Sequence, residues 1–430
     1  MRQEPEHCPM SYPQLLFYAA GIGITVGFLS AAYYWTLELG FQWVWKTLPN
    51  RIDYPSWSTF NEFVWPLTTL GGLLVGLAVH YLGAPSGGLR GCIAEIHAEG
   101  RVDYRQTPGM IVASLLSLTF GSSAGPEAPL VDINGGFGTW LADRLKLSVA
   151  ATRVFTLCGM SAAFGAFFGT PLGSTLLALE IPHRWGLEYY EALIPTLIAA
   201  IGGFAIFRLC TGLTIGGLYE FPHYPELQIE HLLYAILLGA IGAGTAILFS
   251  WIFQTLGKWV QPLTQHPVIL TTLGGLAIGL IATVLPLTLF YGERQIQTII
   301  DLGERLGSGL LLLIALAKMV TLSISVHSGF RGGILFPLFF MGATVGMAVS
   351  LMLPQIPPTV GMICTMAALS VAILKTPMGL IIVLNVISHT TMMPLITVAT
   401  TISLLLTAQV NLLYTKQHRT ESHQLEILPR

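Results

Sequence analysis

Charged residues are scarce in this chain. Of its 430 residues, 20 are Lys or Arg and 22 are Asp or Glu, together 10%, whereas a soluble domain carries about 25%. A water-soluble protein of this size could not cover its surface with so few charges, and the same composition excludes an intrinsically disordered chain. The net charge of −2 leaves no basic surface for nucleic acid, so we expect no nucleic-acid partner.

Patterns that hold metals or cofactors are also missing. The five Cys residues include no Cys-x-x-Cys pair, which favours packed or idle thiols over metal ligands or disulfides. The eleven His residues show no His-Glu-x-x-His or other ligand spacing, and no run resembles a nucleotide-binding loop. We therefore predict no metal site and no cofactor.

Long runs without charge are what the chain has instead. Each exceeds the ~20 apolar residues that span a bilayer as a helix. The runs without Asp, Glu, Lys or Arg include 7–37, 63–89, 106–126, 154–179, 231–257, 259–292, 332–374 and 376–415. They predict an all-α polytopic membrane protein. The 46 Gly and 25 Pro residues, many of them inside these runs, predict closely packed helices that are short, tilted and partly discontinuous.

Basic residues give the expected orientation. They cluster at 90–105, 144–153 and 416–419, and by the positive-inside rule these sides face the cytoplasm. The segment around Lys46 is expected to face outward. We predict a cytoplasmic N-terminal segment at 1–13, one transmembrane domain at 14–415 and a short cytoplasmic tail at 416–430.

An internal repeat divides the transmembrane domain into halves at about 14–215 and 226–415. The pattern Gly-x3-Gly-x3-Pro at 121–129 returns at 329–337, with an offset of 208. The sequence Thr-Pro-Leu-Gly at 170–173 returns as Thr-Pro-Met-Gly at 376–379, with an offset of 206. Gly-x3-Gly alone can mean only helix packing, but two motifs at nearly one offset indicate duplicated halves.

Helices that start inside a membrane have a specific chemistry. Their first N–H groups lack partners and carry partial positive charge, glycines allow close approach, and converging N-termini suit an anion. Duplicated halves with such broken helices are typical of transporters with a binding site between the halves. This interpretation requires Arg331, inside the second motif, to point away from the anion path.

Acidic residues inside apolar runs are functional candidates. Glu127 lies in the first motif at an expected helix N-terminus, where it would compete with an anion for the same N–H donors, so its protonation could open a gate. The alternative is a static first-turn acid. Glu180 ends the run 154–179 and is either a proton relay or an interfacial acid paired with Arg184. Asp132 is expected to be a packing or pore-flank residue, and Lys318 to snorkel.

The residues 121–125, Gly-Ser-Ser-Ala-Gly, match the nucleophile elbow of hydrolases at Ser123. That motif acts only between a strand and a helix, and both flanks here are apolar membrane sequence. An intramembrane hydrolase would need a partner such as His389. We predict that the protein is not an enzyme.

These residues resemble the CLC family of chloride channels and proton/chloride antiporters. The family signature Gly-Arg/Lys-Glu-Gly-Pro corresponds to Gly-Pro-Glu-Ala-Pro at 125–129, and its Gly-x-Phe-x-Pro to Gly-Ile-Leu-Phe-Pro at 333–337. The resemblance runs from about residue 15 to 415. It implies an inverted repeat of about eighteen helices per subunit, a homodimer in the lipid bilayer with one pore in each subunit, and a bacterial inner-membrane location.

The resemblance also assigns roles. Glu127 falls on the gating glutamate and Glu180 on the inner proton glutamate of the antiporters. The expected anion-binding residues are Ser86, Gly125, Ala128, Gly333, Ile334, Leu335, Phe336 and Tyr414. In this chain Pro126 replaces the basic residue of the signature and Ala128 a glycine. We expect proton-coupled exchange of chloride or a similar anion; the alternative is a passive chloride channel on the same fold, with or without voltage gating.

Overall fold

A computed structural model describes residues 10–48, 60–83, 95–96, 100–182, 190–213, 219–222, 224, 228–388 and 392–409. Within these ranges the chain forms fourteen α-helices, a few single turns of 3-10 or π-helix, and no strand. Eight helical segments are long and apolar enough to cross a membrane. The predicted all-α polytopic membrane fold is therefore confirmed.

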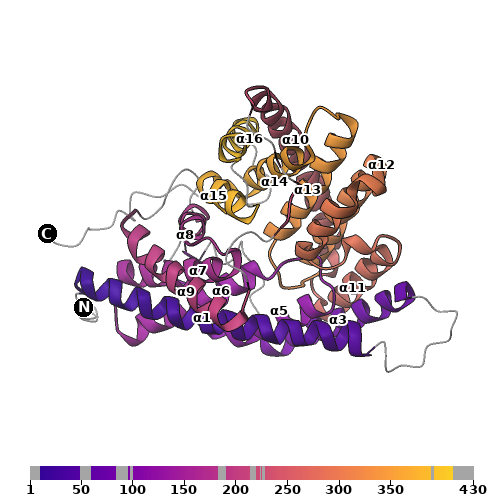
Figure 1. Ribbon diagram of the computed structural model, residues 1–430. Helices are drawn as coiled ribbons and strands as arrows, with labels where there is room; N and C mark the ends of the chain where they lie inside the picture. Colours follow the sequence, from indigo (N-terminus) through magenta and orange to yellow (C-terminus); the bar gives the residue numbers. More distant parts are fainter. Residues whose placement is uncertain are drawn as a thin grey trace.

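Seven helices belong to each half (Figure 1). Those of the first half are α1 (Tyr12–Gln42), α3 (Phe60–Leu82), α5 (Thr107–Thr119), α6 (Glu127–Arg144), α7 (Val149–Phe168), α8 (Pro171–Glu180) and α9 (Leu193–Thr211). Those of the second half are α10 (Glu230–Val260), α11 (Pro267–Val284), α12 (Glu293–His327), α13 (Leu335–Met352), α14 (Pro358–Leu374), α15 (Pro377–Ile387) and α16 (Met393–Leu406). Helix α12 is two helices joined at a kink, where Gly307 has φ 77°.

The sequence explains why many of these helices are short. Pro occupies the first turn of α8 and of its repeat equivalent α15, where its missing N–H costs no hydrogen bond. The preceding helices, α7 and α14, end on equivalent left-handed residues, Gly169 with φ 68° and Lys375 with φ 55°. The same stop-and-restart signal thus breaks the membrane helices at matching places in both halves.

The two halves use the same packing. Helix α6 packs on α7 as α13 packs on α14, and α1 packs on α9 as α10 packs on α16. A Cβ at Gly138 would lie 2.2 Å from the carbonyl oxygen of Phe155, and one at the equivalent Gly346 would lie 2.2 Å from that of Gly361. Glycine is therefore required at both crossings because the helix backbones touch.

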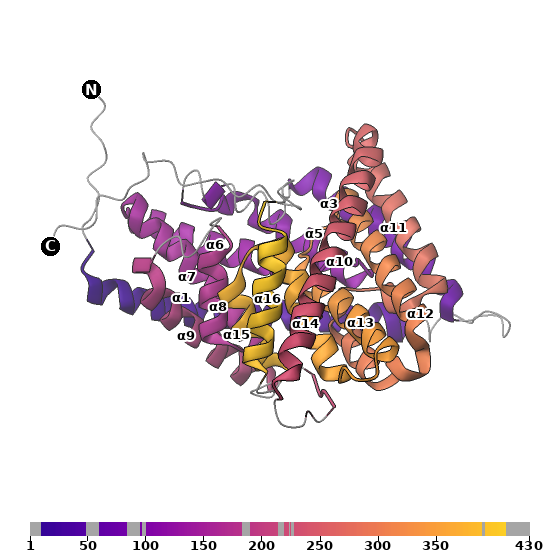
Figure 2. The ribbon, with the colours of Figure 1, turned by 90° about the horizontal axis from the view of Figure 1, so that it is seen from above.

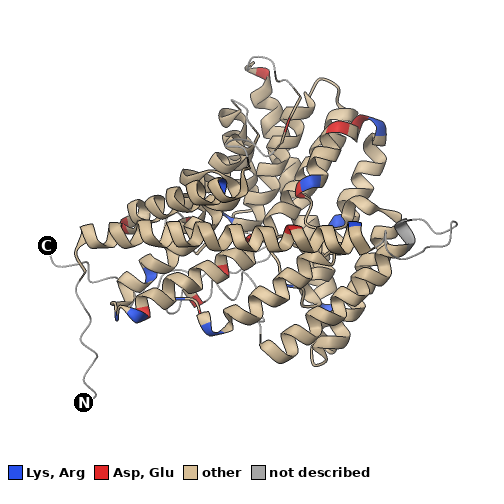
Figure 3. Ribbon diagram, turned by 60° about the horizontal axis from the view of Figure 1, so that its bottom comes forward, with Lys and Arg blue, Asp and Glu red and all other residues tan. Residues whose placement is uncertain are grey.

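Across the repeat, α8 lies beside α15 (Figures 1 and 2) and α3 packs along α11. Helix α13 is the most enclosed of the candidate spans, with 89% of its apolar window buried inside the protein. Charged residues are few and scattered over a mostly uncharged ribbon (Figure 3). The starts of α6, α13 and α15 therefore lie in an apolar interior, where any polar group needs a partner from the protein itself.

Candidate anion and proton site

The two copies of the glycine motif meet at the centre of the molecule. The N–H of Gly125 donates to the carbonyl oxygen of Gly333 at 2.7 Å, and the N–H of Gly333 donates to that of Gly125 at 2.6 Å. These glycines are equivalent in the repeat, and a reciprocal pair between equivalent residues is what a two-fold axis through this point produces. The turns before them also match, since Gly121 has φ 92° and Gly329 has φ 97°.

Glu127 lies directly over this bridge. It is the first residue of α6 and is 3% exposed. Its Oε1 accepts a hydrogen bond from the backbone N–H of Leu335 at 2.6 Å, while Oε2 has no hydrogen-bond partner among the described residues. A Cβ on Gly125 would lie 2.0 Å from Oε2, and one on Gly333 would lie 2.3 Å from Oε1. Both glycines are needed because the carboxyl group fills the space that a side chain would take.

The loops that hold this arrangement are bonded to each other across the repeat. The N–H of Ser123 donates to Ser325 Oγ at 3.0 Å, and the N–H of Arg331 donates to Ser117 Oγ at 2.9 Å. The Ser123 hydroxyl lies 3.1 Å from the Thr321 hydroxyl, and a threonine is not a general base. Ser123 is thus bonded as a structural residue; His389 lies outside the described residues.

Glu180 occupies the second place where the halves meet. It is the last residue of α8 and is 2% exposed. Its Oε1 accepts from the N–H of Met378 at 3.0 Å and its Oε2 from the N–H of Gly379 at 2.8 Å. These amides belong to the first turn of α15, which is the second copy of the Thr-Pro-x-Gly motif. The carboxylate of one half therefore caps a helix N-terminus of the other, while Arg184 lies outside the described residues.

Two further charged residues lie close to the motifs. Arg331 is 7% exposed, and its guanidinium interacts electrostatically with Asp132 on α6. The prediction that Lys318 snorkels is wrong. Its side chain is fully buried, and Nζ donates to the carbonyl oxygen of Thr288 at 3.1 Å and to that of Phe290. The ammonium group ties down the turn before α12 because those carbonyls have no helical partner to bond.

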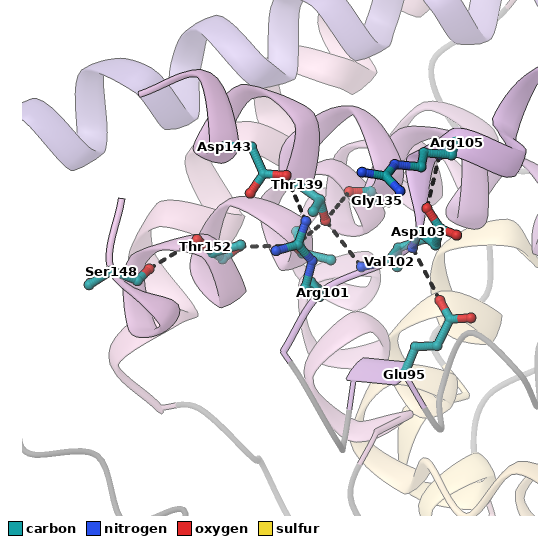
Figure 4. Close-up of polar contacts among 11 residues, drawn as sticks. Glu95, Arg101, Val102, Asp103, Arg105, Gly135, Thr139, Asp143, Ser148 and Thr152 are labelled. Carbon is teal, nitrogen blue, oxygen red and sulfur yellow. Dashed lines mark hydrogen bonds and ion pairs between the residues drawn. The ribbon is translucent and has the colours of Figure 1, made fainter. Parts of the chain in front are cut away.

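The predicted cytoplasmic cluster forms a separate polar region (Figure 4). Arg101 pairs with Asp143 at 2.6 Å, and the N–H of Asp103 donates to Glu95 Oε2 at 3.2 Å. With Arg105 these side chains line a cavity of about 380 Å³. The segment before α5 is thereby fastened to the last turn of α6.

The described residues contain part of the predicted anion shell. Leu335 N–H points at Glu127, while the N–H groups of Gly125 and Gly333 are occupied by each other. Ala128 and Ile334 are buried beside the same junction. The two hydroxyl residues of the prediction, Ser86 and Tyr414, lie outside the described residues, so their role stays a prediction.

A comparison with protein families gives a match to the model of the voltage-gated chloride channel over residues 71–408, more than three quarters of the chain. This chain belongs to the CLC family. Relatives include the "Putative ion-transport protein YfeO" of Escherichia fergusonii, 26% identical over 82% of this chain and 83% of its own length, and the protein of the same name in Salmonella typhimurium, 26% identical over 88% of this chain and 90% of its own length.

Solved structures show the same CLC fold. A CLC-type fluoride/proton antiporter has a TM-score of 0.79 at 20% identity and covers 93% of this chain and 98% of its own. A slow cyanobacterial Cl⁻/H⁺ antiporter has a TM-score of 0.80 at 22% identity, covering 92% of this chain and 96% of its own. Family membership and fold together indicate that the protein is an integral membrane protein that transports anions.

Proposed function

We propose that this CLC protein exchanges chloride or a similar small anion for protons across a bacterial inner membrane. One observation carries the proposal: two buried glutamates, Glu127 and Glu180, each accept hydrogen bonds from backbone amides that begin a helix of the other half. A passive pore needs a path for the anion alone. Two protonatable groups placed at the junction of the halves supply a path for protons as well.

The Glu127 site links proton and anion occupancy through competition. A buried carboxylate needs donors to offset the loss of water, and the Leu335 amide at 2.6 Å is such a donor. A small anion suits the same helix N-terminus, so the carboxylate and the anion exclude each other. Protonation removes the charge that holds Glu127 to this amide, and the side chain can then leave. The amides of Ile334, Leu335 and Phe336 become available to the anion.

Glu180 serves the proton alone. Both of its oxygens accept hydrogen bonds from α15 amides, and these two bonds hold the carboxylate in place when an anion passes. A fixed carboxylate in the apolar interior can take up a proton and release it without opening a path for the anion. In this proposal Glu180 passes protons between the cytoplasmic side and Glu127.

The test is coupled flux in liposomes that contain the purified protein. An outward chloride gradient, with the membrane potential clamped by a potassium ionophore, is expected to drive protons inward against their own gradient. Glu180→Gln is the matched control, because an amide fills the same volume but carries no proton. Chloride efflux without proton movement in the wild type would instead establish a passive channel.

We also propose that the protein is a homodimer. Apolar side chains on α8, α9 and α15 are exposed in the single subunit, including Leu172, Ile201 and Met378, and the family resemblance implies a paired assembly. Single-molecule photobleaching of labelled protein in liposomes is expected to show two steps. Full activity from molecules that bleach in one step would overturn the dimer.

A further inference from the structure

A second cavity shares Glu38, Phe41 and Arg294 with a cavity that Lys46 lines, and the segment around Lys46 is expected to face outward. We call this second cavity the outer cavity; its volume is about 320 Å³, and Arg208, Glu293, Phe167 and Tyr291 are among its lining residues. The rings of Phe167 and Tyr291 contact the ring of Phe336, with centroids 5.5 and 5.8 Å apart. Phe336 follows Leu335 at the start of α13, so these rings connect the lining of the outer cavity to the helix start that holds Glu127.

Arg208 brings a fixed positive charge to the cavity. It lies in the last turn of α9, is 7% exposed, and its Nε and Nη2 atoms have no hydrogen-bond partner among the described residues. The guanidinium packs against Gly169, where a Cβ would lie 2.5 Å from Nη2. The ring of Phe204 lies 5.8 Å from its Cζ atom. Packing therefore fixes the guanidinium in place, although no carboxylate of the described chain pairs with it.

The other charges of the cavity are already engaged. Arg294 pairs with Glu38 at 2.6 Å. Glu293 Oε2 accepts a hydrogen bond from the Tyr291 hydroxyl at 2.7 Å. Glu293 acts on Arg208 electrostatically without an ion-pair contact. Among the described residues, Arg208 is thus the lining cation of this cavity with no paired carboxylate.

We propose that Arg208 binds a small inorganic anion such as chloride in the outer cavity, as a station on the way to the Glu127 site. The inference rests on the proposed anion transport but not on proton coupling. The cavity has room for the anion and several waters, since one water occupies about 30 Å³ of liquid. Glu293, which also lines the cavity, repels an anion. That repulsion keeps the site weak enough for the anion to leave, which conduction requires.

The decisive experiment compares two variants that each remove one charge. Uptake of radioactive chloride from the outside is measured against chloride concentration in liposomes whose protein orientation has been determined. Arg208→Gln is expected to raise the half-saturating chloride concentration about fivefold to tenfold, because a charge-assisted contact is lost. Glu293→Gln is expected to lower it, because a repulsion is lost. Arg208→Lys, which keeps the charge but not the planar fork, should fall between the wild type and Arg208→Gln.

An anion at Arg208 is supported if the two charge variants shift the half-saturating chloride concentration in opposite directions. The proposal is overturned if both variants shift it in the same direction, or if both change it by less than twofold. If Arg208→Gln does not fold, judged by its elution and thermal unfolding, then Arg208→Lys and Glu293→Gln carry the test with the same signs. The number of protons moved per chloride is recorded for every variant. A wild type that moves no protons would remove the exchange proposal, while the shifts at Arg208 would still decide the outer site.

Discussion

The Glu127 and Glu180 sites are built from the same parts but hold their carboxylates differently. In both, an acid of the first half accepts amide hydrogen bonds from a helix start in the second half. Glu127 is bonded through one oxygen, whereas Glu180 is bonded through both, to the neighbouring amides of Met378 and Gly379. One bond can be exchanged for an anion, while a two-pronged contact keeps its carboxylate in place.

The surroundings of the two acids reinforce this difference. The backbone at Gly125 and Gly333 leaves space that the Glu127 carboxyl group fills. At the other site, a Cβ on Gly379 would lie 2.6 Å from the backbone nitrogen of Leu177, which shows that α8 and α15 touch along their backbones. In the proposed mechanism, Glu127 is therefore the carboxylate that leaves and Glu180 the one that stays.

The largest expected effect is at Glu127. Glu127→Gln should abolish proton movement and make anion flux independent of pH, whereas wild-type flux should rise as the pH falls because protonation frees the Leu335 amide. Flux and proton uptake in liposomes across a range of pH check this. The exposed Glu304→Gln is the control for removal of one carboxylate. A Glu127→Gln variant that still drives protons uphill would show that Glu127 does not couple the two ions.

Glu180→Gln should separate the two functions of the protein. Proton movement is expected to disappear while chloride flux persists, because the amide oxygen still accepts from α15 but the group carries no proton. The same assay measures both. Proton movement that survives in this variant would return Glu180 to the role of a static helix cap.

Gly333→Ala should make the Glu127 site behave as if it were partly open. Its new Cβ would lie 2.3 Å from Oε1, so the carboxylate must leave the Leu335 amide. We expect a several-fold rise in chloride flux at high pH and a flatter pH dependence. Gly309→Ala, whose Cβ would meet nothing within 4 Å, is the matched control and should change neither.

Lys318→Met should lower the thermal stability of the protein without affecting proton transfer through Glu180. The substitution leaves the carbonyl oxygen of Phe290 without its Lys318 donor and that of Thr288 with only the Ser123 hydroxyl at 3.3 Å, at a cost of about 1–3 kcal/mol. Thermal unfolding followed by fluorescence-detected size exclusion should show a lower transition temperature. Proton transfer through Glu180 should be retained, since Lys318 bonds the turn before α12 and has no described contact with α8 or α15. An unchanged transition temperature would contradict the anchoring role.

The smallest effects are expected from the hydroxyl residues. Ser86→Ala and Tyr414→Phe should each weaken equilibrium chloride binding several-fold, because one neutral hydrogen bond contributes about 0.5–1.5 kcal/mol. Titration calorimetry on protein that elutes normally would measure this. Unchanged affinity in both variants would exclude these residues from the anion site.

The sequence was sufficient for the fold class, because charge-free runs and repeated Gly/Pro signals are local properties. It also singled out the two acids, which the structure buries where the halves meet, while their roles in transport stay predictions. It also predicted that the Gly125 and Gly333 motifs belong to one site. It could not show that these two glycines bond each other and leave Leu335 to hold Glu127, since that depends on how the halves dock. Lys318 was misjudged because its carbonyl partners, Thr288 and Phe290, are about 30 residues away.

The outer cavity was missed for a related reason. Arg208 and Glu293 lie at the ends of apolar runs, where charged residues normally face water. Their positions in the sequence therefore do not indicate a binding site. Their meeting place is set by α9 and α12, from different halves. The sequence does show that Arg208 is a basic residue at the end of an apolar helix. It does not show that the guanidinium is buried, because burial depends on how the helices pack.

The long sequence separation between each acid and its amide partner has a consequence for how the protein is synthesised. Glu127 and Leu335 are 208 residues apart, and Glu180 and Met378 are 198 apart. While the ribosome is still synthesising the second half, the first half is already in the bilayer with both acids deprived of these amides, and an unpartnered buried polar group is costly there. The Glu127 site cannot form until Leu335 has been translated, and the Glu180 site cannot form until Gly379 has been translated. A product terminated before Leu335 is therefore not a weak transporter but an unfinished one, in which both acids lack their amide donors.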